Sequence, residues 1–402
     1  MLSDLDTLMS SAGIGTIVVS MHEALDPSFR WLTRGAALTR GHVLKSRGSE
    51  PLLLHYPMER EEAGSVGLPT RSVLDFDQPA IFRDASTPVD AWSRFFRRIF
   101  ADLSLPGPFA FYGLGPVDLY AEVVPRLEQE GIPIHHGVGE DYLALARKRK
   151  EPHEIEAIAS VAERTEQVVQ SVRDLLRSSE IRSGELYTNG KRLLIGDLKT
   201  LVSTEIVRLG MVEDHETIVS QGFDAAVPHS RGTPEDPVRA SVPLVIDIFP
   251  ADRQSGYFFD LTRTLCPGEI PARLGEIHAD VLAAFERARD SMKAGTRASD
   301  YQNLVCDYFE ERGYPTLRSD PKTDHGYVHL LGHGVGLQVH ERPSFSIAPS
   351  NLDLIEVGDV LTIEPGLYFP DEKIGVRIED TLWIDDSGRP VSFCKGDRSL
   401  RV

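Results

Sequence analysis

The feature that most constrains this chain is the position of acidic residues inside apolar, strand-like segments. Asp247 lies in the middle of the apolar segment 243–249, and Asp260 lies in the second such segment, 256–262. The turn-type residues 252–256 between the segments predict a β-hairpin, which brings the two carboxylates together. A buried carboxylate is destabilising unless it is paired or bound to a metal. A divalent cation between the two side chains would offset both their burial and their mutual repulsion.

The same pattern recurs near the end of the chain. Glu364 closes the apolar segment 360–364, and Glu379 lies in the segment 375–381, after the turn-rich residues 370–373. Any one of these four acids is as easily explained by an isolated salt bridge. Two hairpins that each supply two acids favour two halves closing on one shared site.

A histidine-containing segment lies between the two hairpins. His333 stands among glycines, which offer little side-chain bulk to block a metal, and His340 follows seven residues later. The glycine pattern is not followed by a clean helix, so it does not predict a dinucleotide-binding loop. Four carboxylates and one imidazole, without a thiolate, suit Mn²⁺, Co²⁺ or Zn²⁺. Two ions about 3.5–4 Å apart would activate a bridging water and polarise a carbonyl, which indicates hydrolysis of an amide or ester.

The 402 residues predict two domains. Over residues 1–145, strand-like segments alternate with helical ones, which predicts a small α/β domain. The expected strands are 16–20, 51–55, 80–83 and 108–112, and the expected helices include 2–11, 88–103 and 117–131. The basic run Arg147-Lys148-Arg149-Lys150 is interpreted as a solvated face at the domain boundary. A long helix over 154–178 opens the second domain, 152–402, which becomes strand-rich from about residue 244.

Composition argues against several classes of function. The formal net charge of −18 disfavours nucleic acid or an anionic membrane as the main partner. Cys266, Cys306 and Cys394 stand far apart, which favours a reducing compartment. The first 21 residues lack the basic start of a secretory signal, and no apolar run approaches a membrane span. We therefore expect a cytoplasmic enzyme that binds neither nucleic acid nor a membrane.

Several motifs together resemble the pita-bread metallopeptidases of family M24, in the Xaa-Pro peptidase branch of prolidase and aminopeptidase P. They fall in the family's order across about residues 150–402, and residues 1–145 more weakly resemble the creatinase-type N-terminal domain. The motifs are Val245-Ile246-Asp247, Phe259-Asp260-Leu261-Thr262-Arg263-Thr264, Gly332-His333-Gly334-Val335-Gly336-Leu337, Val339-His340-Glu341, Ile363-Glu364-Pro365-Gly366 and Gly375-Val376-Arg377-Ile378-Glu379-Asp380. The implied fold class is α+β, with a C-terminal pita-bread (creatinase/aminopeptidase-like) catalytic domain and a smaller α/β N-terminal domain.

The resemblance also implies residue roles. The five ligands of two divalent ions would be Asp247, Asp260, His333, Glu364 and Glu379, with Asp260 and Glu379 bridging. Glu364 would also move protons to and from the bridging water, and His340 and His229 would contact the substrate. Arg377, which we include among the substrate-binding residues, would be buried beside the last ligand, where it would hold Glu379.

Two departures from the family pattern concern the substrate side of the site. The usual Asp-x-Gly is replaced here by Asp247-Ile248-Phe249, and Asp247 and Asp260 are 13 positions apart (260 − 247), which predicts a longer hairpin tip. After His340 the chain continues Glu341-Arg342-Pro343, so Arg342 is the candidate for binding a substrate carboxylate.

The predicted function is hydrolysis of the Xaa-Pro bond in a small peptide with proline at its second position, as an Xaa-Pro dipeptidase. The resemblance to the family also implies a homodimer. The alternative is aminopeptidase P, acting on longer peptides. Less favoured are a metal-free creatinase-like hydrolase, a non-catalytic pita-bread binding module, and a methionine aminopeptidase, which usually lacks the N-terminal domain.

Overall fold

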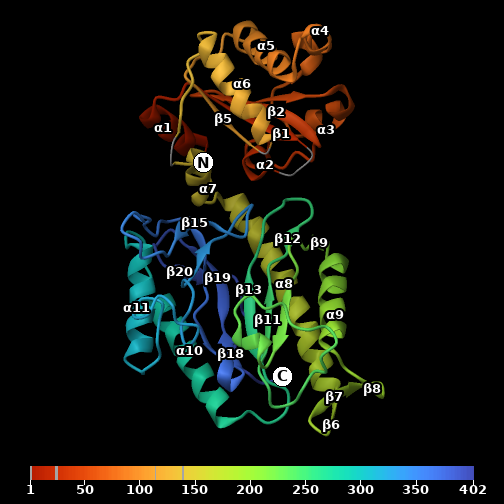
Figure 1. Ribbon diagram of the computed structural model, residues 1–402, viewed down its shortest axis with the longest axis vertical. Helices are drawn as coiled ribbons and strands as arrows, with labels where there is room; N and C mark the ends of the chain where they lie inside the picture. The colour runs from red at the N-terminus through yellow and green to blue at the C-terminus, as the bar shows by residue number, and fades with distance from the viewer. Residues whose placement is uncertain (1, 23–25, 114, 138–139) are drawn as a thin grey trace. The chain divides into compact units, whose positions relative to one another are not determined.

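The computed structural model describes residues 2–22, 26–113, 115–137 and 140–402, and it divides into two compact units. The N-terminal unit is Met1–Arg147 and the C-terminal unit is Lys148–Val402. In Figure 1 the first runs from red to yellow and the second from yellow-green to blue.

The N-terminal unit is built on a five-stranded mixed sheet with the order β4-β3-β2-β1-β5. Its strands are β1 (Thr16–His22), β2 (Arg40–Ser46), β3 (Leu52–His55), β4 (Thr70–Ser72) and β5 (Phe109–Tyr112). Its helices are α1 (Leu2–Ala12), α2 (Pro27–Leu32), α3 (Arg60–Ser65), α4 (Gln78–Asp84), α5 (Pro88–Asp102), α6 (Val117–Gln129) and α7 (Tyr142–Lys148), which extends one residue past the division.

Helices cover both faces of this sheet. Successive side chains of a strand point to opposite faces, and the strands carry apolar residues at successive positions. In β1, Ile17 and Val19 belong to one buried cluster with α1 and α2, whereas Val18 belongs to another with α5 and α6. Each fully buried side chain of this size stabilises the fold by about 1.5–3 kcal/mol. Most of the elements predicted here are confirmed, but the strand predicted at 80–83 is wrong. That segment is α4, with Pro79 in its first turn, and a four-residue apolar run does not by itself separate a strand from a helix.

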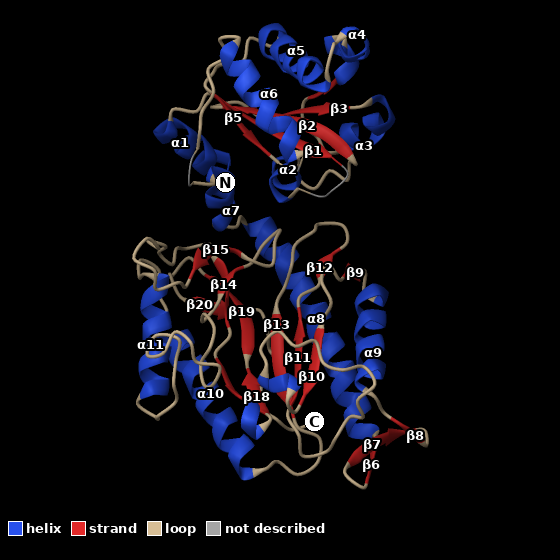
Figure 2. Ribbon diagram, viewed as in Figure 1, coloured by secondary structure: helices blue, strands red, loops and turns tan. Residues whose placement is uncertain are grey.

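The C-terminal unit begins with its longest helix, which confirms the helix predicted over 154–178. Pro152 stands at the first helical position, where its missing N–H leaves no donor unsatisfied. The helices of this unit are α8 (Pro152–Ser178), α9 (Ile195–Arg208), α10 (Ala272–Ser291) and α11 (Ala298–Glu310). Helix α8 packs against α9, and α10 packs against α11, with the strands between the two pairs in Figure 2. Of the helices in the described ranges, none has both the length and the apolar character needed to cross a bilayer.

The central sheet of this unit has eight strands in the order β10-β11-β13-β19-β16-β14-β15, with β20 also paired to β19. These strands are β10 (Ile218–Gln221), β11 (Leu244–Ile248), β13 (Leu261–Leu265), β14 (His333–Gly334), β15 (Glu341–Ser344), β16 (Val360–Ile363), β19 (Glu379–Ile384) and β20 (Pro390–Ser392). The remaining strands form smaller sheets. One contains β6 (Glu180–Arg182), β7 (Glu185–Thr188) and β8 (Lys191–Arg192), another pairs β9 (Met211–Val212) with β12 (Ala251–Asp252), and a third pairs β17 (Gly366–Phe369) with β18 (Ile374–Arg377).

Both predicted hairpins are present, and both are interrupted. Strands β11 and β13 pair antiparallel, but the chain between them leaves the sheet, and β12 pairs with β9 instead. The second hairpin pairs β16 with β19 and, beyond a break at residues 364–365 and 378, β17 with β18. The predicted ligand Glu364 stands in that break.

The basic run before α8 is not a solvated face, which corrects the interpretation made from the sequence. The side chains of Lys148 and Lys150 are buried within the C-terminal unit. Lys148 forms ion pairs with Glu356 and Asp359, and Lys150 pairs with Glu341. These acids lie about 200 positions further along the chain, so no local pattern could reveal them.

Candidate metal centre and catalytic cavity

Strand register places the first and last predicted ligands on the two strands that flank β13. Asp247 on β11 lies opposite Thr262 on β13, and Thr262 lies opposite Glu379 on β19. The Thr262 hydroxyl donates a hydrogen bond to Glu379 Oε2 at 2.7 Å. Asp260 immediately precedes β13, so three of the four acids gather where these strands run side by side.

The remaining two predicted ligands reach the same place through β14 and β16. The Glu364 N–H donates to the Leu331 carbonyl at 2.8 Å, which joins the break after β16 to the histidine segment. The His333 N–H donates to Thr362 Oγ1 at 3.2 Å. His333 Nε2 then lies 3.6 Å from Asp260 Oδ2 and 3.6 Å from Glu364 Oε1.

The glycines beside His333 are required for close backbone packing. A Cβ on Gly332 would lie 2.2 Å from the Thr362 carbonyl oxygen, and one on Gly334 would lie 1.9 Å from that of Arg342. The sequence suggests that these glycines leave room for a metal, whereas the structure shows that they let β14 approach its neighbouring strands.

The carboxylates are held in an environment that opposes their ionisation. Burial and the neighbouring acids raise the pKa values of Asp260, Glu364 and Glu379 well above the usual range of a carboxyl group. Burial lowers the pKa of His333 to about 4, with a smaller contribution from His340. Since His333 Nδ1 lies 3.0 Å from the Gly334 carbonyl, it carries the proton and leaves the Nε2 lone pair facing the acids.

These groups fit a divalent cation. Asp260, His333 and Glu379 each offer a ligand atom, and the three atoms lie within 4.8 Å of one another. Among the described residues, Asp247 Oδ1, Asp260 Oδ1 and Glu379 Oε1 are buried without a hydrogen-bond partner. Unpaired buried oxygens are costly, and a hard cation would satisfy all three while relieving the repulsion.

Arg377 contacts a different acid from the one predicted. Its guanidinium donates to Asp247 Oδ2 at 2.5 Å and to the Tyr368 hydroxyl oxygen at 2.9 Å, and it makes no hydrogen bond to Glu379 among the described contacts. Arg377 instead reaches Glu379 through Thr262, to whose Oγ1 it donates at 3.2 Å, and its charge opposes the rise in the pKa of Glu379. In β18 the arginine points across β13 to β11, while Thr262 holds Glu379.

The Arg377 contact continues to a histidine that the sequence did not single out. Tyr368 lies 2.9 Å from His329 Nε2, and His329 Nδ1 lies 2.8 Å from the Leu330 carbonyl. Burial lowers the pKa of His329 to about 3, which agrees with a neutral ring that accepts from the tyrosine hydroxyl. The position of His329, four residues before His333, was the available signal in the sequence.

A cavity of about 450 Å³ opens over this cluster. All five predicted ligands line it, together with His229, His340 and Arg377. His340 and His229 are exposed, and the His340 ring contacts the His333 ring edge-on with 4.4 Å between centroids. The lining also includes His215, Phe249 and Arg231, which sequence reasoning did not identify.

Arg342 is not among the residues that line this cavity. Its guanidinium forms an ion pair with Asp353 at 2.8 Å, and its side chain is 40% exposed. His340, two residues earlier, lines the cavity, and the side chain of Glu341 is buried beside Lys150 instead. The structure thus gives no support to Arg342 as the group that binds a substrate carboxylate.

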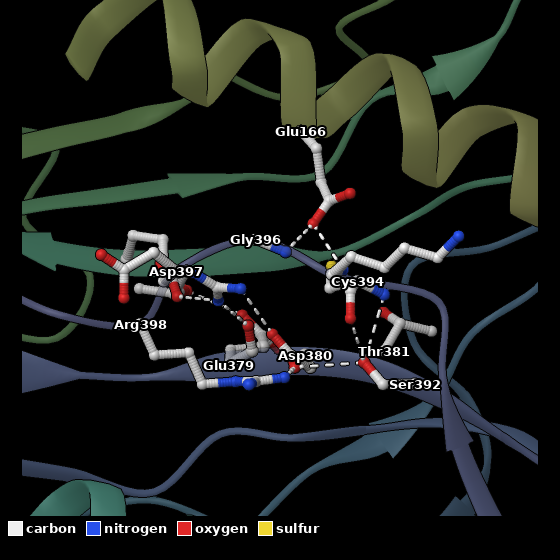
Figure 3. A network of polar contacts seen from close by, with 12 residues as sticks. Glu166, Glu379, Asp380, Thr381, Ser392, Cys394, Gly396, Asp397 and Arg398 are labelled. Carbon is white, nitrogen blue, oxygen red and sulfur yellow. Dashed lines mark hydrogen bonds and ion pairs between the residues drawn. The ribbon is translucent and has the colours of Figure 1, made fainter.

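A network of charged side chains surrounds Asp380, the residue that follows the predicted ligand Glu379 (Figure 3). Asp380, next to Glu379, pairs with the buried Arg263 at 2.8 Å and also with Arg398. Arg263 in turn donates to the Glu379 carbonyl at 2.7 Å. Glu166 of α8 accepts the N–H groups of Lys395 and Gly396, which fastens the C-terminal segment beside this network.

Comparison with known proteins identifies the class to which this fold and site belong. Residues 156–386 match metallopeptidase family M24, and the chain belongs to that family. The chain is 34% identical over 173 residues to an Xaa-Pro dipeptidase of Pyrococcus furiosus. That match covers 43% of this chain and 45% of the relative, so it spans less than half the length of either.

Solved structures match over nearly the whole chain. An Xaa-Pro dipeptidase from Bacillus anthracis has a TM-score of 0.77 at 22% identity and covers 100% of this chain and 99% of that one. An X-Pro aminopeptidase from Thermotoga maritima MSB8 has a TM-score of 0.74 at 23% identity and covers 97% and 98%. The predicted fold class, a C-terminal pita-bread domain after an N-terminal domain, is confirmed.

Proposed function

We propose that this chain is a metal-dependent Xaa-Pro peptidase that prefers dipeptides. The observation that carries the proposal is the buried cluster of Asp260, His333 and Glu379, with Asp247 and Glu364 beside it and several oxygens left without partners. We assign these five residues as the ligands of two divalent ions, Mn²⁺, Co²⁺ or Zn²⁺. Such ions, when bound, supply Lewis-acid polarisation of the scissile carbonyl and activation of water.

The chain's own residues would perform the remaining steps. A carboxylate oxygen of Glu364 takes the proton of the attacking water and passes it to the proline nitrogen as that nitrogen leaves. His340 and His229, exposed in the cavity, orient the peptide around the scissile carbonyl and donate to the oxygen that gains charge. Arg377, which also donates to the Tyr368 hydroxyl oxygen, holds Asp247 in place at the wall of the cavity.

The test is hydrolysis of Ala-Pro, Ala-Pro-Ala-Ala and Ala-Ala by protein loaded separately with each of the three metals. Cleavage of Ala-Pro alone supports the dipeptidase. Cleavage of the tetrapeptide at its first bond supports aminopeptidase P, a title that one of the structural matches also carries. Activity that survives complete chelation would indicate a metal-free hydrolase, and bound metal without any cleavage would indicate a binding module.

A preference for dipeptides requires a cation for the free carboxylate of proline. Arg231 lines the cavity and forms an ion pair with the half-exposed Glu216 at 3.1 Å. We propose that Arg231 binds that carboxylate. Arg231→Met should raise the KM for Ala-Pro about tenfold and leave kcat for the tetrapeptide unchanged, whereas the matched Arg342→Met variant should change neither. If only Arg342→Met raised the KM for Ala-Pro, Arg342 and not Arg231 would be the residue that binds the substrate carboxylate.

We further propose that the enzyme works in the cytoplasm as a homodimer, without binding nucleic acid or membranes. Cys266, Cys306 and Cys394 are buried and free, as a reducing compartment favours, and the net charge is −18. Light scattering coupled to gel filtration tests the dimer: a mass near 45 kDa, that of one 44.6 kDa chain, would contradict it.

A further inference from the structure

Lys150 is a buried cation outside the catalytic cavity. Its side chain is 1% exposed, and its ammonium donates to Glu341 Oε2 at 2.9 Å and to the Lys148 carbonyl at 3.2 Å. The Glu341 side chain is itself only 3% exposed. A buried pair of this kind keeps its geometry, because separating the charges would leave each of them unpaired.

Glu341 connects this cation to the loop over the metal cluster. Its Oε1 accepts the N–H of Leu337 at 3.1 Å, and a Cβ on Gly336 would lie 2.4 Å from its Oε2. The carboxylate therefore packs against the backbone of Gly336 and Leu337, in the loop 335–340 that joins β14 to β15.

The same loop carries His340. Its first residues are fixed by backbone hydrogen bonds, from Val335 to Val360 and from Phe258 to Gly336. The Glu341 carboxylate holds the middle of the loop through the Leu337 N–H, and Glu341 directly follows His340 in the chain. Movement of this carboxylate would shift the imidazole that lies 4.4 Å from His333, centroid to centroid.

We propose that Lys150 is a positioning residue: through Glu341 it fixes the loop 335–340 and thereby the orientation of His340 toward the substrate. The proposal rests on the function proposed above, since it assigns His340 to the substrate. A displacement of about 1 Å at such a group is enough to slow a reaction by about 10²-fold.

Lys148 provides the matched control. It lies two residues away, is also buried, and forms ion pairs with Glu356 and Asp359 and a hydrogen bond to the Leu354 carbonyl. None of these partners belongs to the loop 335–340. A role that is merely structural predicts similar consequences for the loss of either lysine.

The experiment compares Lys150→Met with Lys148→Met in the metal-loaded, full-length protein. We expect Lys150→Met to lower kcat for Ala-Pro about 10- to 100-fold with unchanged metal content, and Lys150→Arg to recover most of it. Glu341→Gln, which keeps an acceptor for Leu337, should lower kcat in the same direction and serves if Lys150→Met folds poorly. Lys148→Met should lower the thermal midpoint without changing kcat.

Hydrogen exchange of the amides 335–341 supplies a readout that does not depend on activity. These amides should exchange at least tenfold faster in Lys150→Met than in Lys148→Met. Equal exchange and equal kcat in the two variants would overturn the proposal while leaving the peptidase function intact. If the wild type cleaves no peptide, the proposed function fails, and the exchange data alone decide whether Lys150 anchors the loop.

Discussion

At the scale of the residue, the site is organised by charges that cannot all be ionised without a partner. Burial raises the pKa of Asp260, and the neighbouring acids Glu379, Asp247 and Glu364 raise it further. The repulsion between these carboxylates lowers the stability of the metal-free protein. If Asp260 had only a structural role, a neutral side chain would serve better at this position. The proposed role as metal ligands accounts for this arrangement, since a bound cation would offset the repulsion that destabilises the metal-free protein.

Asp260→Asn tests the ligand assignment, because the assignment predicts opposite effects on protein stability without and with bound metal. Without metal, the variant should be more stable than the wild type, since a like charge is removed. With metal, it should gain less stability and lose turnover, since a ligand charge is gone. Thermal unfolding with and without Mn²⁺, together with metal analysis after dialysis, measures both effects. A variant that binds metal and turns over as the wild type does would contradict the ligand assignment.

His340→Ala should separate catalysis from metal binding. The ring is exposed in the cavity and contacts His333 without replacing it as a ligand. We expect unchanged metal content and a kcat lowered about 10²-fold, the effect typical of losing one positioned catalytic group. Loss of metal in this variant would show that His340 itself is a ligand.

At the scale of the element, β19 carries Glu379 toward the cavity and Asp380 toward a buried arginine. Arg263 is almost completely buried, and Asp380 is its ion-pair partner. Asp380→Asn should therefore destabilise the protein by about 3–5 kcal/mol, the usual cost of leaving a buried charge unpaired. Urea unfolding of the variant and the wild type measures this loss in the free energy of unfolding.

The control for this variant lies in the same network. Asp397 is exposed, and its carboxylate accepts hydrogen bonds from Ser399, while only its main-chain carbonyl contacts Arg263. Asp397→Asn should change the free energy of unfolding by less than about 1 kcal/mol. Equal losses in the two variants would mean that the Arg263 charge is not what Asp380 stabilises.

The elements also show what the sequence could and could not predict. Both hairpins were predictable, because a carboxylate inside an apolar strand is costly and therefore informative. The partner of Arg377 was not, since it depends on register between β11, β13 and β18. Lys150 looked like part of a solvated basic run because its partner, Glu341, is 191 positions away. A local sequence pattern can therefore predict that an acid in a strand is buried. It cannot predict which residue, distant in the sequence, forms an ion pair with a buried lysine or arginine.

At the scale of the whole molecule, the N-terminal unit should lose stability in acid. In the N-terminal unit, burial lowers the pKa of His42 to about 3, with a smaller contribution from His22. The ring packs against Trp92, Phe95 and Phe96, and its Nδ1 lies 2.9 Å from the Ser20 hydroxyl. The folded unit thus holds this imidazole neutral, whereas the unfolded chain protonates it near pH 6.5.

The sign of the resulting pH dependence follows from linkage. Because the folded pKa lies below the unfolded one, the stabilisation is complete above about pH 6.5 and is lost as the pH falls toward about 3. At pH 5 the loss from His42 alone should be about 2 kcal/mol relative to pH 7. His42→Phe keeps the aromatic packing and removes the titrating group, so its unfolding free energy should change by about 2 kcal/mol less over this range. Urea unfolding followed by tryptophan fluorescence measures the difference, and equal pH dependence in the variant and the wild type would locate the acid sensitivity outside this cluster.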